Sequence, residues 1–183
     1  MSYTDASYRK TNKAFFLDRD DTLIKDFGYL DDPDKVELLE GVVDALKEIR
    51  HQGYKLLVIT NQSGLTRGSV AVENLELIHQ KISDLFALEG VRIDGYYSAP
   101  YQHGHPRRKP GAGLLEEAAT DWGIDFSRSW MAGDKWRDLY AGWTKGCRTL
   151  LVNEAPEQRA LFQNFQPDLI LQDWSEFVSL PTS

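Results

Sequence analysis

Three aspartates follow an apolar segment near the start of the chain, and their spacing could support metal-assisted chemistry. Residues 14–17 are Ala-Phe-Phe-Leu, and Asp18, Asp20 and Asp21 come directly after them. The apolar segment is typical of a buried parallel strand, whereas aspartate disfavours strands and is rarely buried without a partner. In extended backbone, Asp18 and Asp20 point to the same side. Such a pair can hold a divalent cation, with one carboxylate attacking and the other moving a proton. A solvated turn is the simpler interpretation.

The segments that must position these aspartates alternate between buried strands and amphipathic helices. Strands are expected at residues 14–18, 55–60, 92–98, 129–132, 148–152 and 169–171, and helices at 41–52, 72–88, 111–122, 135–145, 157–165 and 174–178. This alternation predicts an α/β fold with three layers, α/β/α, and a mostly parallel central sheet of the Rossmann-like kind. Ligands bind such sheets at the carboxyl ends of the strands, which is where the aspartates fall.

The order of these segments predicts one domain over residues 1–183, without an internal repeat or an interdomain linker. Residues 1–13 form a polar lead-in to the first strand. Residues 19–35 form a polar loop too long for a simple connection, so we expect a substrate-facing flap, with a loop of no further role as the alternative. Prolines and glycines interrupt residues 99–110, which are therefore expected to be irregular.

The amino-acid composition limits the classes of protein to which this chain can belong. Hydrophobic residues make up 42% of the chain and charged residues 27%, as in soluble globular proteins. Without a bilayer-spanning segment or a signal-peptide core, the sequence predicts a cytoplasmic protein, taken as a monomer, that has no membrane partner. Cys147 is the only cysteine, which excludes an intrachain disulfide and a cysteine-rich zinc site. The net charge of −7 argues against general nucleic-acid binding.

A second polar segment follows the strand expected at 55–60. Thr60 ends that strand with a hydroxyl group, and Asn61 and Gln62 come directly after it. A hydroxyl group and the backbone amides that follow it can bind an anion such as a phosphate oxygen. The alternative is a threonine that only caps its own turn.

One basic and one acidic segment lie further along the chain. Lys109 follows Arg108 and precedes Pro110, which favours a fixed loop, although an exposed basic cluster is the alternative. A lysine there could pair with a phosphate or a carboxylate as a point charge. Asp134 precedes the helix expected at 135–145, so it could cap that helix. Asp138 lies one turn later, where it either supports a metal site or is solvated.

Together these segments resemble the four motifs of the haloacid dehalogenase (HAD) superfamily of phosphotransferases, in the same order. The matching residues are Asp18-Arg19-Asp20-Asp21-Thr22, Val58 to Gly64, Arg108-Lys109-Pro110, and Met131 to Lys135 with Asp138. The resemblance implies a HAD-like fold and a magnesium-dependent phosphatase that forms an aspartyl-phosphate. Within the superfamily, the chain resembles the branch of heptose 1,7-bisphosphate and histidinol-phosphate phosphatases, whose members are compact and lack a large cap domain.

The resemblance also implies a role for the residues at the four motifs. Asp18 would be the nucleophile, and Thr60 and Lys109 would hold the transferring phosphate. Asp20 would be the general acid for the leaving alkoxide and then the base for water. The side chains of Asp18 and Asp134 and the backbone carbonyl of Asp20 would bind Mg²⁺, which prefers oxygen ligands.

Further residues have supporting or substrate-binding roles by the same resemblance. The supporting residues are Thr22, Lys135 and Asp138. The substrate-binding residues are Asn61, Gln62, Arg67 and Arg108. The two arginines could hold the second phosphate of a bisphosphate by charge-assisted hydrogen bonds, unless both are solvated.

The sequence departs from the family pattern at two places. The family usually has glycine or another small residue at the position of Asp21, although aspartate tolerates tight-turn conformations better than most residues. The branch commonly holds a structural zinc ion on cysteine and histidine ligands before Arg108, but residues 99–110 contain no cysteine. His103 and His105 alone cannot build a closed tetrahedral site, so we expect a shortened loop without zinc.

The leading hypothesis is the hydrolysis of a small phosphorylated metabolite, with D-glycero-D-manno-heptose 1,7-bisphosphate as the first candidate and its C7 phosphate as the group removed. Histidinol phosphate or another sugar phosphate is an alternative, because Asp26, Asp31 and Asp32 in the flap could bind an ammonium group. A catalytically silent phosphometabolite-binding protein is the alternative from another class. A nucleic-acid end phosphatase would need a basic groove, and Arg107 to Lys109 is the only basic run.

Overall fold

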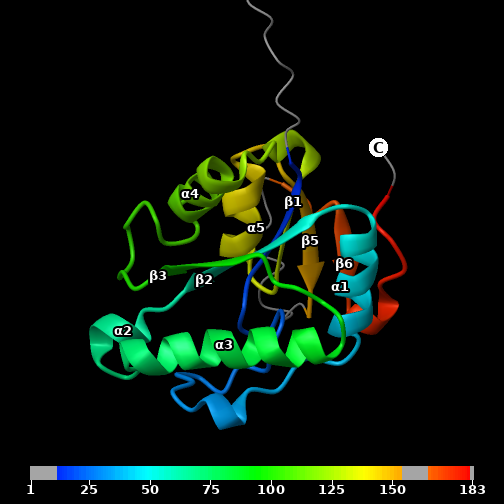
Figure 1. Ribbon diagram of the computed structural model, residues 1–183. Coiled ribbons are helices and arrows are strands. Elements are labelled where there is room, and N and C mark those ends of the chain that lie inside the picture. The colour runs from blue at the N-terminus through cyan, green and yellow to red at the C-terminus, as the bar shows by residue number, and fades with distance from the viewer. Residues whose placement is uncertain (1–11, 154–164, 182–183) are drawn as a thin grey trace, which may run out of the picture.

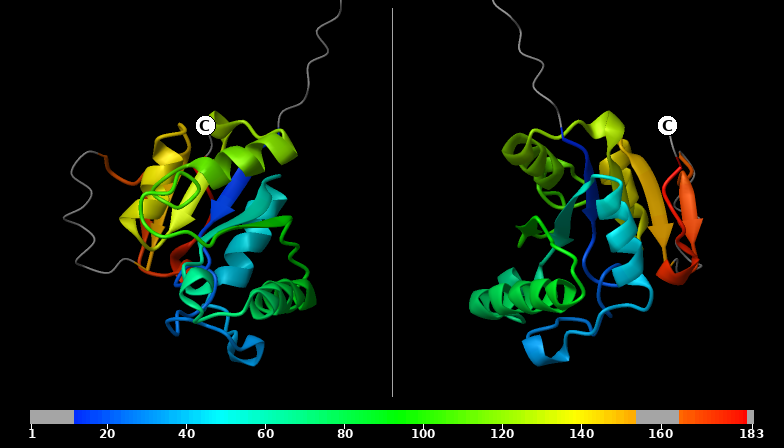
Figure 2. Two further views of the ribbon diagram at one scale, coloured as in Figure 1. Left: turned by 90° about the vertical axis from the view of Figure 1, so that its left-hand side faces the viewer. Right: turned by 45° about the vertical axis from the view of Figure 1, so that its right-hand side comes forward.

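A computed structural model describes residues 12–153 and 165–181 of the chain, which form a parallel sheet between two layers of helices (Figure 1, Figure 2). The six strands lie in the order β3-β2-β1-β4-β5-β6, and every neighbouring pair is parallel. The predicted three-layer α/β/α arrangement is therefore confirmed. No helix within the described ranges is long and apolar enough to cross a membrane.

The strands and α-helices begin and end within about two residues of the expected positions, except β3, which begins at Gly95 instead of residue 92. The strands are β1 (Ala14–Leu17), β2 (Lys55–Asn61), β3 (Gly95–Ala99), β4 (Trp130–Gly133), β5 (Arg148–Val152) and β6 (Leu169–Leu171). The α-helices are α1 (Val42–His51), α2 (Gly64–Arg67), α3 (Val72–Leu88), α4 (Gly113–Trp122) and α5 (Trp136–Trp143), and short 3-10 helices cover Pro33–Lys35, Phe126–Arg128 and Trp174–Glu176.

Side chains that alternate along β1 divide the interior into two cores. Phe15 and Leu17 pack with apolar residues of α1 and α3 on one face of the sheet. Phe16 packs with apolar residues of α4 and α5 on the other face. Since a strand turns successive side chains to opposite faces, β1 is buried on both sides, as the continuous apolar run predicted. Its carboxyl end is therefore fixed at the centre of the sheet.

Several expected segments differ from the structure or fall outside the described ranges. Residues 61–69, between the strand expected at 55–60 and the helix expected at 72–88, contain α2, which ends after one turn at Gly68 with φ at +70°. The helix expected at 174–178 is only a 3-10 turn, capped by the Asp173 carboxylate, which accepts a hydrogen bond from the Ser175 N–H. Most of the helix expected at 157–165 lies outside the described residues, as do residues 1–11 of the lead-in.

The flap of residues 19–35 runs from the end of β1 to the 3-10 turn at Pro33–Lys35, which contacts α3 (Figure 1). Its first turn is closed by the Asp21 N–H, which donates to the Ile24 carbonyl at 2.8 Å. Near its far end, the Asp31 carboxylate accepts a hydrogen bond of 2.9 Å from the Ala71 N–H, just before α3. The flap is thus anchored at both ends by hydrogen bonds.

The C-terminal 3-10 turn supports the segment that follows β1. Trp174 is buried, and its indole N–H donates to the Thr22 carbonyl at 2.6 Å. The backbone of this turn also packs closely on Gly41, where an added Cβ would lie 2.6 Å from the Ser175 nitrogen. Gly41 therefore has to be glycine both for this contact and for its φ of +76°.

We expect Gly41→Ala to lower the free energy of unfolding much more than Gly68→Ala. Both glycines have positive φ, which costs alanine about 1–2 kcal/mol, but only Gly41 has backbone within contact distance of a new Cβ. The loss at Gly41 should therefore exceed about 3 kcal/mol. Urea denaturation of both variants measures the difference, and equal losses would contradict the close contact with residues 174–175.

Candidate active site

The four predicted motifs meet at the carboxyl ends of β1, β2 and β4. A cavity of about 130 Å³ opens there. It is lined by Asp18, Asp20, Asp26, Gly28, Tyr29, Asn61, Gln62, Ser63, Gly64, Arg108, Lys135 and Arg137. Thr60, Lys109, Asp134 and Asp138 are buried. Of the predicted substrate-binding residues, Asn61, Gln62 and Arg108 line the cavity, and Arg67 does not.

A buried ammonium group joins the motifs. Lys109 is 1% exposed, and its Nζ lies 2.5 Å from Asp18 Oδ1, 2.8 Å from Asp138 Oδ1 and 2.6 Å from the Ile59 carbonyl. Burial works against the charged amine, but Asp138 and Asp18 outweigh it and raise the pKa of Lys109. The expected pairing of Lys109 with Asp18 is confirmed, and the alternative of an exposed basic cluster is wrong for this residue.

Asn61 fixes the backbone on which this lysine stands. Its side-chain oxygen accepts a hydrogen bond of 3.0 Å from the Lys109 N–H, and its side-chain N–H donates to the Lys109 carbonyl, also at 3.0 Å. Both ends of the amide are therefore occupied, although Asn61 lines the cavity. The sequence predicted that Asn61 contacts the substrate. In the structure, its side-chain amide instead forms hydrogen bonds with the Lys109 backbone.

Three carboxylates crowd together beside the lysine. Each of Asp18, Asp134 and Asp138 offers an oxygen, and these oxygens lie within 4.8 Å of one another. Burial and the charges of Asp18 and Asp138 raise the pKa of Asp134 to about 7. Asp134 Oδ2 lies 2.5 Å from Lys135 Nζ, while its Oδ1 is buried without a hydrogen-bond partner. A hard divalent cation such as Mg²⁺ fits this all-oxygen group, because it would bind the free oxygen and reduce the repulsion.

Asp138 lies beside Asp18 and Asp134, which agrees with the sequence interpretation that it supports a metal site. It is fully buried, so the solvated alternative is wrong. Its Oδ2 accepts a hydrogen bond of 3.1 Å from the Lys135 N–H and so caps α5. The sequence analysis had considered Asp134 for this helix cap. A Cβ on Gly133 would lie 2.5 Å from the Asp138 Cβ, so this approach requires the glycine before Asp134.

Asp20 is held by a buried arginine that the sequence analysis left without a role. Arg19 is 1% exposed; its Nε donates to Asp20 Oδ1 at 2.9 Å and its Nη2 to Oδ2 at 3.0 Å. Gln62 Nε2 donates to the same Oδ2 at 3.1 Å and to Thr60 Oγ1 at 2.8 Å. Burial raises the pKa of Asp20, and the charge of Arg19 opposes this shift. One sequence feature could have revealed Arg19: it is a basic residue between two aspartates at the end of a buried strand.

Arginines form the basic side of the cavity. Arg108 and Arg137 line it, and the Nε atom of each is buried without a hydrogen-bond partner. Burial and the charges of Arg137 and Arg67 lower the pKa of Arg108. Arg67 stands further out, where it donates to the Tyr29 hydroxyl group and to Gln102 Oε1. Arg137 was missed because it falls between two motif residues.

Asp21 and Thr22 shape the turn after the nucleophile position. Asp21 has φ at +55°, in the region that glycine favours, and its Oδ1 accepts a hydrogen bond of 3.0 Å from the Asp26 N–H. Thr22 is fully buried. Aspartate therefore tolerates the conformation at this position, as expected, and adds a hydrogen bond that glycine could not provide.

The shortened loop of residues 99–110 is braced by ring stacking. The rings of Tyr101 and His105 stack with centroids 3.5 Å apart, and His105 Nδ1 accepts a hydrogen bond from the Arg107 N–H. His103 is exposed. Within the described ranges, the aspartates above are the one group of three or more side chains placed to hold a metal ion.

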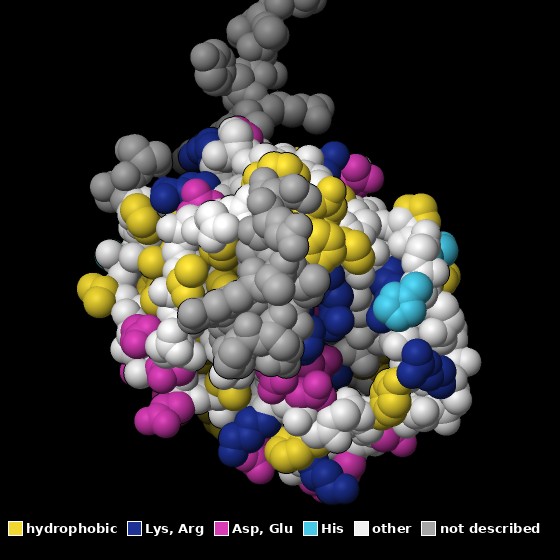
Figure 3. Space-filling model, turned by 180° about the vertical axis from the view of Figure 1, so that it is seen from behind, with side chains coloured by type: hydrophobic (Ala, Val, Ile, Leu, Met, Phe, Trp, Pro, Cys, Tyr) yellow, Lys and Arg dark blue, Asp and Glu magenta, His cyan; other side chains and the backbone are white. Residues whose placement is uncertain are grey.

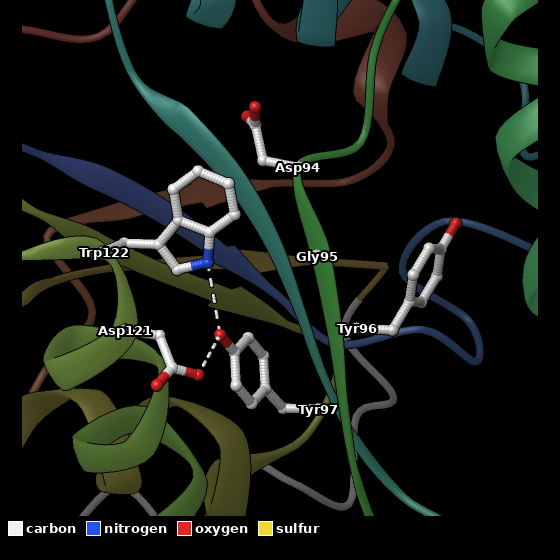
Figure 4. Close-up of a pocket in the computed structure, with 6 residues that line it drawn as sticks. All are labelled: Asp94, Gly95, Tyr96, Tyr97, Asp121 and Trp122. Atoms are coloured by element: carbon white, nitrogen blue, oxygen red, sulfur yellow. Dashed lines mark hydrogen bonds between the residues drawn. The ribbon is translucent and has the colours of Figure 1, made fainter.

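A larger hollow of about 490 Å³ lies along the edge strand β3 (Figure 4). Its polar groups are already paired: the Tyr97 hydroxyl group donates to Asp121 and accepts from Trp122 Nε1, and Asp94 accepts from Arg50 and the Leu56 N–H. None of the predicted site residues lines this hollow. The smaller cavity is therefore the candidate active site.

We expect Asp21→Ala to lower the free energy of unfolding by about 1–2 kcal/mol, because alanine disfavours positive φ and cannot accept the Asp26 hydrogen bond. Asp21→Asn should stay within about 0.5 kcal/mol of the wild type, since asparagine tolerates this conformation and keeps an acceptor. Urea denaturation checks both. An Asp21→Asn loss as large as that of Asp21→Ala would show that the charge, and not the turn, is required.

The chain is similar in sequence to a family model and to known enzymes. A family model for HAD-hydrolase-like proteins matches residues 106–177. The D-glycero-beta-D-manno-heptose-1,7-bisphosphate 7-phosphatase of Haemophilus ducreyi is 35% identical over 175 residues, covering 91% of this chain and 96% of the relative. The enzyme of the same name from Escherichia coli K12 is 36% identical over 144 residues, covering 72% and 74%.

Two solved structures have the same fold. D,D-heptose 1,7-bisphosphate phosphatase from B. bronchiseptica, complexed with magnesium and phosphate, superimposes with a TM-score of 0.78 and is 28% identical, covering 89% of this chain and 94% of that one. The enzyme of the same name from Burkholderia thailandensis gives a TM-score of 0.65 at 27% identity, covering 88% and 92%. The chain therefore belongs to the HAD-like hydrolases, in the family of the heptose-1,7-bisphosphate 7-phosphatases.

Proposed function

We propose that this protein is a magnesium-dependent phosphomonoesterase that removes the C7 phosphate of D-glycero-D-manno-heptose 1,7-bisphosphate. The observation that carries the proposal is the contact between Asp18 and the buried Lys109 within a group of three carboxylates, at a cavity whose other side holds Arg108 and Arg137. The relatives named above, and the magnesium and phosphate bound by one of them, support the choice of substrate and metal.

Asp18 is the nucleophile in this proposal. One carboxylate oxygen attacks phosphorus, the bond from phosphorus to the sugar oxygen breaks, and an aspartyl-phosphate remains on the enzyme. Lys109 stays charged beside Asp18 and offsets the repulsion between carboxylate and phosphate. Mg²⁺, held by Asp18, Asp134 and the Asp20 carbonyl, supplies further positive charge when bound.

Asp20 moves the proton. Its carboxyl group donates a proton to the leaving sugar oxygen, and its carboxylate then takes one from the water that hydrolyses the aspartyl-phosphate. Its raised pKa suits the first of these steps. Thr60 and Gln62 contact each other beside it and would bind phosphate oxygens, while Asp138 and Lys135 hold the metal-binding segment in place.

A second phosphate would bind to the arginines. Arg108 and Arg137 line the cavity, and Arg67 stands at its rim beside Tyr29. In Figure 3, basic side chains lie beside a group of acidic ones on one face of the molecule, as a site for both metal and phosphate requires. An ammonium-bearing substrate is less favoured, because Asp31 and Asp32 bond to backbone N–H groups of the chain and only Asp26 lines the cavity.

The remaining parts of the proposal concern the setting of the enzyme. The whole chain would form one domain that acts as a monomer in the cytoplasm, with neither nucleic acid nor a membrane as a partner. The net charge of −7 supports the exclusion of nucleic acid. The loop of residues 99–110 would need no zinc, and the stacking of Tyr101 on His105 supports this. The flap of residues 19–35 would face the substrate through Asp26, Gly28 and Tyr29.

We expect Asp18→Asn to lower kcat at least about 1,000-fold, because the amide cannot attack phosphorus. Phosphate release should be measured with Mg²⁺ and with chelator on both anomers of heptose 1,7-bisphosphate, histidinol phosphate and fructose 1,6-bisphosphate. The wild type should release phosphate only with Mg²⁺ and fastest from a heptose bisphosphate. Full activity of Asp18→Asn would exclude the mechanism, and release from histidinol phosphate alone would exclude the substrate.

We expect Arg137→Gln to raise KM for the heptose bisphosphate about tenfold and to leave KM for the matching 7-monophosphate within about twofold. The reason is that only the bisphosphate has a second anionic group for this guanidinium, and a hydrogen bond to a charged group contributes about 1.5–3 kcal/mol. Arg92→Gln is the matched control, since the Arg92 side chain is 76% exposed and lies outside the cavity. Equal effects on the two substrates would contradict a second-phosphate site.

A further inference from the structure

The buried Arg19 follows Leu17 by two residues, on the face of the sheet where a polar cluster from α3 and β3 packs. His79 comes from α3, and its ring stacks on that of Tyr96 in β3, with centroids 4.4 Å apart and planes 15° apart. The Tyr96 hydroxyl group shares a hydrogen bond of 2.9 Å with Ser83 Oγ, one turn after His79 on α3. None of these three residues belongs to a motif, and none lines the active-site cavity.

Two atoms of this cluster have complementary unused hydrogen-bonding capacity. Arg19 Nη1 and His79 Nε2 are both buried without a hydrogen-bond partner. Buried polar groups are nearly always hydrogen-bonded, and leaving one unpaired costs about 1–3 kcal/mol. A guanidinium N–H can only donate, whereas an unprotonated imidazole nitrogen accepts. Each of these atoms is therefore the partner that the other lacks.

The electrostatics of His79 agree with this pairing. Burial, together with the charge of Arg19, lowers the pKa of His79 to about 3, so its ring is neutral at physiological pH. The same guanidinium charge also acts on Tyr96, whose ring stacks on that of His79. A neutral ring with its proton on Nδ1 has Nε2 free to accept.

We propose that His79 is a positioning residue for the general acid, because its Nε2 accepts a hydrogen bond from Arg19 Nη1 directly or through one water molecule. This inference rests on the phosphatase mechanism proposed above. Arg19 uses its Nε and Nη2 atoms to grip both oxygens of Asp20, so an acceptor for Nη1 fixes the remaining edge of the guanidinium. The stacked Tyr96 and its bond to Ser83 hold the His79 ring in place. His79 thus acts on Asp20 through Arg19, without touching the substrate.

The test compares two classes of phosphate ester. A sugar phosphate leaves as an alkoxide and needs a proton from Asp20, whereas p-nitrophenyl phosphate has a stable leaving group and does not. His79→Phe keeps a ring for stacking on Tyr96 but removes the acceptor, and should lower kcat/KM about tenfold on the sugar phosphate and less than about twofold on the aryl ester. His79→Gln, which retains an acceptor oxygen, should recover most of the loss. His51→Phe is the control, since His51 is exposed at the end of α1.

The outcomes separate this inference from the proposed substrate. If His79→Phe lowered kcat/KM equally on both esters, His79 would have only a structural role. An unchanged kcat/KM on the sugar phosphate would also overturn the inference. If the wild type cleaves the aryl ester but no heptose bisphosphate, the proposed substrate is wrong. Nitrogen NMR of the His79 ring still tests the proposed hydrogen bond with Arg19 in that case. In the wild type, the His79 proton should be on Nδ1 from pH 5 to 8. A proton on Nε2 would exclude the pairing with Arg19.

Discussion

The contact of Lys109 with Asp18 and Asp138 is the constraint on which the site depends. A buried ammonium group is tolerated only when its partners are in place, and removal of one partner of a buried ion pair typically costs about 3–5 kcal/mol. Asp18 follows β1, and Asp138 lies in the first turn of α5. The backbone of Lys109 is held by Asn61 at the end of β2. A single side chain thus connects three parts of this edge of the sheet, so the same contacts that hold the edge together also assemble the site.

Three buried carboxylates stand close together around this lysine. Lys109 and Lys135 contact them, and Arg137 Nε lies 4.0 Å from Asp138 Oδ1. Burial and the charges of Asp18 and Asp138 nevertheless raise the pKa of Asp134, and one of its buried oxygens has no hydrogen-bond partner. A protein that needed only a stable sheet edge would gain from replacing such a group by apolar residues. The crowding of these oxygens is understandable as a site for a divalent cation.

The sequence was sufficient for the elements but not for all of the contacts between them. Strands β1, β2, β4 and β5 were located closely, because they are buried on both faces and form continuous apolar runs, whereas the partly exposed strand β3 begins at Gly95 instead of residue 92. The motifs located Asp18, Lys109 and Asp134 by their residue types and their order along the chain. Contacts such as Lys109 with Asp138 depend on the path of the loops between elements, which no local pattern specifies. Arg19 and Arg137 were missed because each lies between motif residues, and only burial or the cavity reveals its role.

Asp18 and Asp20 are chemically identical side chains that meet different cations, and this difference separates their roles. Asp18 contacts the ammonium group of a fully buried lysine, a point charge with no fixed orientation. Asp20 is gripped by the planar guanidinium of Arg19, which fixes the plane of the carboxyl group, while burial raises its pKa. A nucleophile needs its charge near phosphorus, but an acid must also present its proton along one direction. The planar partner therefore belongs on Asp20, and anything that orients Arg19 orients the proton transfer.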